Sequence, residues 1–200
     1  DNRNLAWDAS RLLSGSLEAQ VELYVDDFQP QEGLGGFRSW ATKGGVAVGG
    51  IWAGPLDNTD IQAELVFVNQ YAYTHRITGN EYTHGGLLLG YPTGPDAETI
   101  WVKATRYWTP RLQGTVTWLR VRTGQGAISR AHTVADPPEW QYLSGTEQAT
   151  REWSLGAKYH ALGSWAVGIT LTSSHTANAG NRLGERVAYR QLALSVGYGR

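Results

Sequence analysis

The residues of this chain best suited to chemistry gather between positions 76 and 98, in the sequence RITGNEYTHGGLLLGYPTGPDAE. The candidate ligand-binding side chains of this segment and its surroundings, with one later tryptophan, are His75, Arg76, Asn80, Tyr82, His84, Asp96 and Trp140. Aromatic faces can stack on sugar rings, and the polar groups can bond to sugar hydroxyls. The segment could therefore hold a glycan. Equally, it could be a structural lid, because most polar loop residues are simply solvated.

Metal chemistry has weaker support in the sequence. His75 and His84 are nine residues apart, a spacing that is not specific to metal sites, and the chain has no cysteine to supply a thiolate. Asp26 and Asp27 could form an acid/base pair or bind a divalent cation, but capping of the following loop is the favoured interpretation. We expect no metal and no cofactor.

Catalysis is also a minor hypothesis. His132, His160 and His175 could each meet a serine or an aspartate, as in barrel lipases or proteases, but no nucleophile elbow is present. We therefore expect no catalytic residues and a protein that is not an enzyme.

The elements that must position these residues are strands. The pattern predicts strands over residues 2–11, 17–27, 45–54, 60–75, 99–109, 111–123, 151–161, 164–174 and 186–200. Their connections alternate without exception between tight turns (12–16, 55–59, 110, 162–163) and long loops (28–44, 76–98, 124–150, 175–185). Outer-membrane β-barrels have short periplasmic turns and long extracellular loops, so an all-β, antiparallel transmembrane barrel is predicted. A soluble sandwich or lipocalin-like barrel would have loops of mixed length.

Side chains alternate along the strands in the manner of a barrel wall. In residues 17–25, leucine, alanine and valine occupy one face, while glutamate, glutamine and tyrosine occupy the other. The expected lumen-facing ionisable residues are Glu18, Glu22, Glu64, Lys103, Lys158 and His160. The expected aromatic girdle comprises Trp52, Trp108 and Trp165 at the periplasmic end, with Trp101 and Trp153 at the outer end.

Two strands are less regular. The segment 60–75 is apolar on both faces from Leu65 to Val68, which suggests a bulge or an extension above the membrane. The segment 111–123 changes the parity of its apolar residues, so that its faces are not assigned.

Composition narrows the class of protein further. The net charge of -1 gives no basic field for nucleic acid, and no apolar run approaches the length of a membrane helix. Residues 1–200 are expected to form one domain. If the long loops lie outside the cell, the first of the nine strands starts on the extracellular side. Complete bacterial barrels normally have an even number of strands, so we expect this chain to be the C-terminal part of a longer barrel and to lack at least one upstream strand.

A family resemblance agrees with these features. The stretch GGLLLGYPTGPDAE, from Gly85 to Glu98, resembles the G-x-x-LG-x-P-x-G-x-D segment of the Wzi family of outer-membrane capsule-assembly proteins. ELYVDDF, from Glu22 to Phe28, is similar to that family's strand that ends in paired aspartates before an outer loop. The chain departs from the usual terminal aromatic residue of such barrels, because it ends Tyr198-Gly199-Arg200.

The resemblance implies the C-terminal half of an eighteen-stranded outer-membrane barrel that acts as a surface lectin for capsular or exported polysaccharide. The expected partners are thus that polysaccharide, outer-membrane lipid and, in a third hypothesis, other envelope proteins for which the barrel is a scaffold. A diffusion porin is the main alternative function, since the mixed-sign lumen suits either a plug or a pore.

Overall fold

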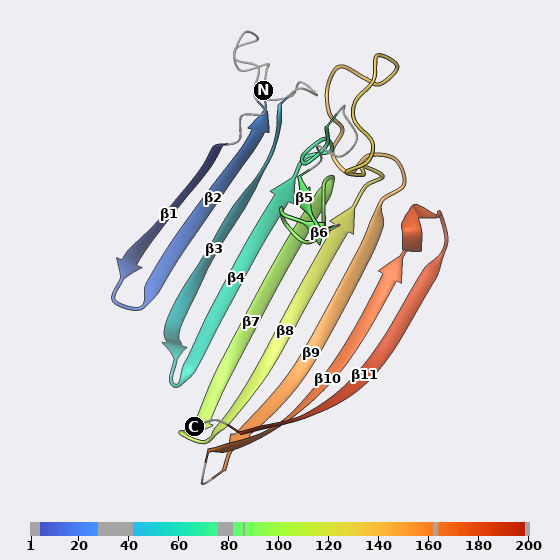
Figure 1. The fold of residues 1–200 in the computed structure, drawn as a ribbon. Coiled ribbons are helices and arrows are strands. Elements are labelled where there is room, and N and C mark those ends of the chain that lie inside the picture. The colour runs from blue at the N-terminus through green and yellow to red at the C-terminus, as the bar shows by residue number, and fades with distance from the viewer. Residues whose placement is uncertain (1–4, 28–41, 76–81, 86, 162–163, 199–200) are drawn as a thin grey trace.

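A computed structural model describes residues 5–27, 42–75, 82–85, 87–161 and 164–198 of the chain (Figure 1). Its strands are β1 (Leu5–Ser14), β2 (Leu17–Asp27), β3 (Lys43–Leu56), β4 (Thr59–Val68), β5 (Thr83–His84), β6 (Leu87–Leu88), β7 (Ala97–Thr109), β8 (Leu112–Thr123), β9 (Gln148–His160), β10 (Trp165–Ala177) and β11 (Arg186–Tyr198). One short 3₁₀ helix, η2 (Ala179–Asn181), precedes β11. In the described part of the chain, no helix has the length and apolarity needed to cross a membrane.

The large strands form a single antiparallel sheet in chain order. Nine strands follow one another as β1-β2-β3-β4-β7-β8-β9-β10-β11, while β5 and β6 pair only with each other. This confirms the all-β prediction and its nine antiparallel strands. Within the described residues no pairing joins β1 to β11, so these two are the edges of the sheet.

Short and long connections lie at opposite ends of the sheet, as predicted (Figure 1). At the short-turn end, β3 and β4 are joined through Asn58, whose φ of 53° suits asparagine in a tight turn. The opposite end, which we name the long-loop end, carries the connections between β4 and β7 and between β8 and β9. Within the described residues, the connections large enough to build a site therefore lie at the long-loop end.

The sheet has one polar and one apolar face. Across the last three strands, Leu171 lies opposite both Leu155 and Leu192, whereas the neighbouring Thr170 lies opposite Gly156 and Ala193. Residues directly opposite in an antiparallel sheet share a face, so each leucine row belongs to the apolar side. The same register places the six predicted lumen residues on the polar side, as expected.

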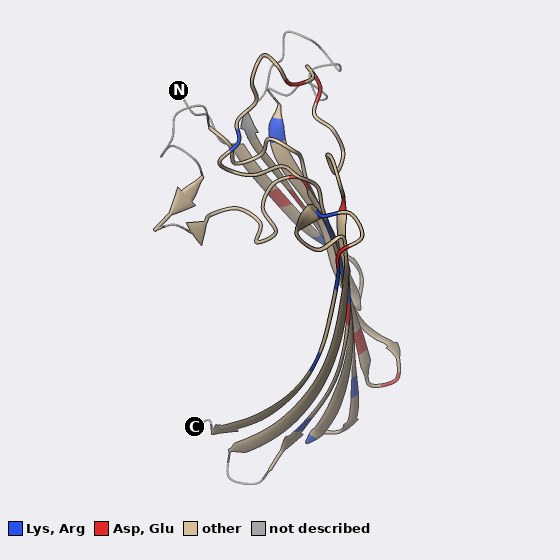
Figure 2. Ribbon diagram, turned by 90° about the vertical axis from the view of Figure 1, so that its right-hand side faces the viewer, with Lys and Arg blue, Asp and Glu red and all other residues tan. Residues whose placement is uncertain are grey.

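The sheet is strongly curved, with the insert between β4 and β7 on its concave side (Figure 2). Because that insert packs against Tyr24 and Val68, which belong to the polar face, the polar face is the concave one. We call it the inner face and the apolar, convex side the outer face. A curve of this kind is what a barrel wall requires, since inner and outer residues alternate along each strand.

One predicted strand is too long. The segment 60–75 leaves the sheet after Val68, and residues 69–74 form turns. The apolar inner residues Val66 and Val68 are 3% and 2% exposed because described residues of the insert (residues 69–96), among them Tyr73 and Tyr91, cover them. The two-faced apolar pattern thus marks burial under a loop, and neither a bulge nor an extension of the strand above the sheet.

The other irregular strand is regular in the structure. β8 pairs with β9 without a register shift from Leu112 to Thr123, so Trp118 faces outward and Leu119 faces inward. Opposite Leu119 lies Trp101, which in turn lies opposite Glu64. Trp101 is therefore an inner residue, and its predicted place in the outer girdle was wrong.

Candidate functional site

The insert is tied to the sheet at both of its ends. The Asn69 side-chain amide donates a hydrogen bond to the Thr42 carbonyl at 2.7 Å, and the Asn69 carbonyl accepts one from the Asp96 N–H at 3.0 Å. The Lys43 ammonium donates to the Thr74 carbonyl at 2.8 Å. These bonds satisfy backbone groups that the loop would otherwise bury without partners. The insert is thereby held down on the inner face at the long-loop end.

A cluster of tyrosine rings forms where the insert meets β2. Tyr73 has a φ of 67°, a left-handed conformation that directs the chain back over the sheet. Its ring centroid lies 5.5 Å from that of Tyr24 and 6.0 Å from that of Tyr82, and Tyr24 and Tyr82 are 5.6 Å apart. These separations lie within the range of attractive aromatic pairs. Two segments distant in sequence, β2 and the insert, thus supply one aromatic surface.

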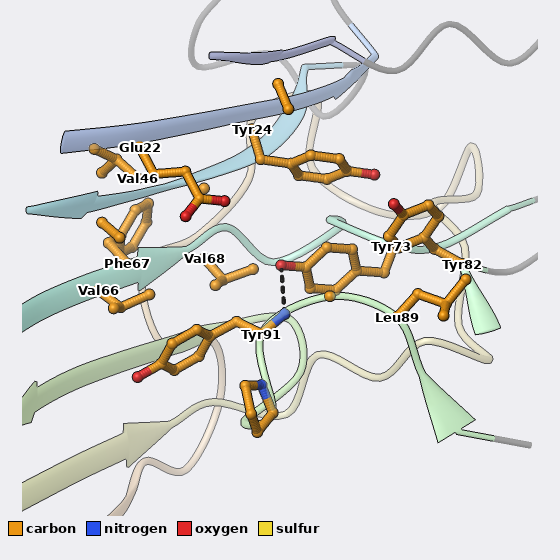
Figure 3. A pocket seen from close by; sticks show the side chains of 15 residues that line it. Glu22, Tyr24, Val46, Val66, Phe67, Val68, Tyr73, Tyr82, Leu89 and Tyr91 are labelled. Carbon is orange, nitrogen blue, oxygen red and sulfur yellow. Dashed lines mark hydrogen bonds between the residues drawn. The ribbon is translucent and has the colours of Figure 1, made fainter. Parts of the chain in front are cut away.

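The fourth tyrosine locks this surface to the sheet. The Tyr91 N–H donates to the Tyr73 hydroxyl at 3.1 Å (Figure 3). The Tyr91 hydroxyl donates to the Glu64 carboxylate at 3.2 Å. Burial and, secondly, the charge of Glu64 raise the pKa of Tyr91. Gly90, the residue before Tyr91, leaves room for the Tyr73 ring, because a Cβ at position 90 would lie 2.3 Å from a carbon of that ring. Glycine is needed for this close approach.

A pocket of about 430 Å³ opens beside these rings on the inner face. Figure 3 shows its walls, to which Tyr24, Tyr73, Tyr82 and Tyr91 contribute together with the Glu22 carboxylate. The volume falls within the usual range of small-ligand pockets. Flat aromatic walls with a carboxylate and hydroxyls at the edge suit a ligand that has both C–H faces and hydroxyl groups.

The predicted site residues are only partly brought together. Tyr82 lines the pocket, whereas His75 is partly buried outside it and His84 is exposed on the β5–β6 hairpin. Arg76 and Asn80 lie outside the described residues. Of the predicted set, only Tyr82 lines the described pocket.

Asp96 is a structural residue where the end of the insert meets the 124–147 connection. It is 1% exposed, and its carboxylate accepts hydrogen bonds from the Gly126 N–H at 2.9 Å and from the Ser144 hydroxyl at 2.6 Å. The Ser144 N–H also donates to this carboxylate, at 3.1 Å. Charge-assisted bonds of this kind are among the stronger ones in proteins. The side chain thus anchors the 124–147 connection and is turned away from the tyrosine pocket.

Trp140 lies on the other side of the sheet from the tyrosine pocket. Its ring centroid is 5.6 Å from that of Phe67, as is the centroid of Tyr142. Phe67 alternates with Val66 and Val68 along β4 and so points to the outer face. Trp140 and Tyr82 therefore do not share a binding surface.

Four of the pocket residues named above, Tyr24, Tyr73, Tyr91 and Glu22, were not among the predicted site residues. Tyr73 lies in a turn whose path has no sequence period, so nothing in the pattern indicated where its ring would point. Tyr24 and Glu22 did carry a signal, because both share the polar parity of residues 17–25 near the long-loop end. An aromatic residue on a polar lumen face is the signal that could have found them.

A second hollow on the inner face, of about 290 Å³, is acidic. Asp8, Glu18, Glu22 and Glu64 line it. Among the residues that the structure describes, no group of three or more His, Cys, Asp and Glu side chains has an arrangement that could hold a metal ion. Asp26 and Asp27 belong to β2, but their side chains are not among the described ones.

Comparisons of the chain with protein-family models, with curated proteins and with solved structures find no match.

Proposed function

We propose that the chain is part of an outer-membrane β-barrel of the Wzi-like class that binds capsular or exported polysaccharide, without catalysis. The observation that carries this proposal is the tyrosine pocket on the inner face at the long-loop end. In a barrel with its long loops outside the cell, such a pocket faces the exported polymer.

The outer face supports a membrane location. On β10 the outward residues Trp165, Val167, Ile169 and Leu171 alternate with small or polar inner ones, and the four are between 43% and 52% exposed. From Trp165 to Ser173, which lies opposite Trp153, the strand runs about 26 Å at ~3.3 Å per residue. A strand tilt of about 40° reduces this to about 20 Å, near the ~25 Å apolar band of outer-membrane barrels. Lipid is the solvent that such a face requires.

The pocket supports a saccharide ligand. A sugar ring has one face of C–H groups, which packs on tyrosine, and a rim of hydroxyls, which the Glu22 carboxylate and tyrosine hydroxyls can bind. The stacked pair of Tyr73 and Tyr82, 16° from parallel, is held in place by the insert, so little side-chain order must be gained on binding. Rings fixed in advance favour non-covalent retention of a long polymer.

The test uses the full-length protein purified from outer membranes in detergent. Its retention of the native surface polysaccharide is compared with that of a Tyr82→Ala variant, for which we expect at least about tenfold weaker retention, the loss typical of a buried aromatic anchor. Tyr189→Ala is the matched control, because Tyr189 is also on the inner face but bonds Glu152 away from the pocket. Equal retention by all three proteins would reject the pocket as the site.

The diffusion porin remains the second candidate, and the acidic hollow favours it. Four carboxylates on the wall formed by β1 to β4 would attract cations into a lumen. Conductance in a planar bilayer, measured on the same preparation, separates the two functions. Cation-selective conductance without polysaccharide retention would identify a porin, and retention without conductance would identify a lectin.

A further inference from the structure

Arginines gather on the outer face directly above the apolar band. Arg151 on β9 lies opposite Arg120 on β8 and opposite His175 on β10. Arg190 on β11 lies opposite Ser173, one row nearer the apolar band, and Arg186 lies at the start of β11. We name Arg120, Arg151, Arg186 and Arg190 the arginine belt. All four belong to the long-loop end of the sheet.

Protein carboxylates balance little of the belt's charge in the described part of the chain: the charge of Arg120 helps to lower the pKa of Glu147, but that carboxylate is itself bound by Arg122. At this end Glu98 and Glu147 are both bound by Arg122, at 3.4 Å and 2.6 Å. In the described part of the chain, the belt arginines make no ion pair, and the buried Nε of Arg120 has no hydrogen-bond partner. Like charges directly opposite each other, as in Arg120 and Arg151, destabilise a sheet. An external anion would balance these positive charges.

A groove of about 440 Å³ begins at the belt and runs down the outer face of β9, β10 and β11. Its upper part lies at Ser173, a small residue between Trp153 and Arg190. Leu155, Leu171 and Leu192 lie in the row below and make its lower walls apolar. The groove thus has apolar lower walls and a positively charged upper rim.

We propose that this groove binds a membrane lipid with an anionic, phosphate-bearing headgroup. The acyl chain lies between Trp153 and the leucine row, and Arg151 and Arg190 hold the phosphate. Guanidinium groups match phosphate oxygens with two parallel hydrogen bonds, and basic side chains at this depth recognise anionic headgroups. The inference rests on the proposed membrane location but not on polysaccharide binding.

The test reconstitutes the full-length protein in phosphatidylcholine vesicles that contain a minor fraction of phosphatidic acid or diphosphoryl lipid A. Lipid that remains bound after detergent extraction is counted by mass spectrometry of the intact protein. We expect one phosphate-bearing lipid enriched over phosphatidylcholine. Removing both charges with Arg151→Ala and Arg190→Ala should weaken the enrichment about thirtyfold, as two arginines near an anionic surface imply.

Two further variants make the result specific. Arg11→Ala with Arg111→Ala removes the same charge from the short-turn end and should keep the lipid. Ser173→Trp fills the groove without changing charge and should lose the lipid while the belt is intact. Enrichment that survives both the belt and the groove variants would overturn the proposal.

The remaining outcomes are also decisive. Displacement of the lipid by inorganic phosphate alone would show an anion site and not a lipid site. Protein that inserts into pure phosphatidylcholine vesicles but enriches no anionic lipid would reject this inference and leave the barrel intact. Failure of the protein to insert would reject both the inference and the proposed membrane location. A second protein that co-purifies bound at the groove would show that a protein, and not a lipid, occupies the groove.

Discussion

At the scale of single residues, the polar side chains of the insert divide into those that build the loop and those that face the pocket. The Asp96 carboxylate and the Asn69 side-chain amide nitrogen bond backbone groups of neighbouring segments. Tyr82 and Glu22 instead turn their polar atoms toward the pocket. Residue type alone does not separate these two roles, because a carboxylate that binds a backbone N–H and one that binds a ligand use the same chemistry.

Replacing Asp96 with alanine is expected to lower the free energy of unfolding by about 3 kcal/mol, because it leaves buried N–H groups of Gly126 and Ser144 unsatisfied. Urea titration of the folded protein measures the change. Asp96→Asn should cost less, since asparagine keeps one acceptor and tolerates the φ of 56°.

The control for this prediction is Asp136→Ala in the same connection. Asp136 accepts hydrogen bonds only within its own turn and from Arg130, at the protein surface. We expect its removal to leave the unfolding midpoint essentially unchanged. An Asp96→Ala variant as stable as Asp136→Ala would contradict the anchoring role.

At the scale of elements, the 124–147 connection is fastened to the sheet through ionised groups. Both Arg122 N–H groups that face Glu147 donate to its carboxylate, at 2.7 Å and 2.6 Å. Hydrogen bonds from Arg122 hold the pKa of Glu147 below its usual value of 4.5. Burial and a hydrogen bond to Glu98 raise the pKa of Tyr142, which packs beside them. The loop is thus held by a charged cluster as well as by Asp96.

This cluster predicts that acid loosens the connection. Because the folded-state pKa of Glu147 is depressed, its contribution to stability is complete above the unfolded value near 4.5 and is lost as pH falls through the lower folded value. Cleavage of the connection by pepsin should therefore rise steeply below about pH 4.5. Glu147→Gln should be cleaved readily even above that pH. Identical pH profiles for the two proteins would contradict the prediction.

At the scale of the whole molecule, the outer face of the curved sheet meets lipid in the proposed barrel, and the inner face meets the aqueous lumen. Ile169 and Thr170 are neighbours on β10, yet Ile169 lies opposite Ala157 and Leu194 on the outer face and Thr170 lies on the inner one. This adjacent pair allows the membrane proposal to be tested within one strand.

Ile169→Lys is expected to destabilise the inserted protein by about 2–4 kcal/mol, the cost of a lysine near the bilayer midplane. Thr170→Lys should be close to neutral because its ammonium reaches the inner, polar side. Urea titration of both variants folded into phosphatidylcholine vesicles measures the difference. Equal costs at the two positions would show that the outer face does not meet lipid.

Much of the fold follows from local patterns in the sequence. The order and direction of the nine large strands, and the facing of the regularly alternating ones, could be predicted because residues i and i+2 on a strand share a face whatever the rest of the chain does. The facing of residues 112–123 came only from their pairing with β9. The alternation of tight and long connections is also a local property. The prediction for Trp101 was wrong because it rested on the position of this residue near a strand end. Trp101 and Lys103 are two residues apart on β7, so they share the inner face.

The site depended on tertiary structure. The paths of residues 69–96 and 124–147 are set by single contacts, such as the left-handed Tyr73 and the buried Asp96, and such contacts leave no period in the sequence. Only the folded chain could show that Val66 and Val68 are covered by a loop, that Tyr24 and Tyr82 adjoin, and that Trp140 lies on the opposite face. The sequence by itself determined the strands, and the two faces of those that alternate regularly, because these follow from periodicity. The tertiary structure decided which distant side chains meet, because irregular loops have no periodicity.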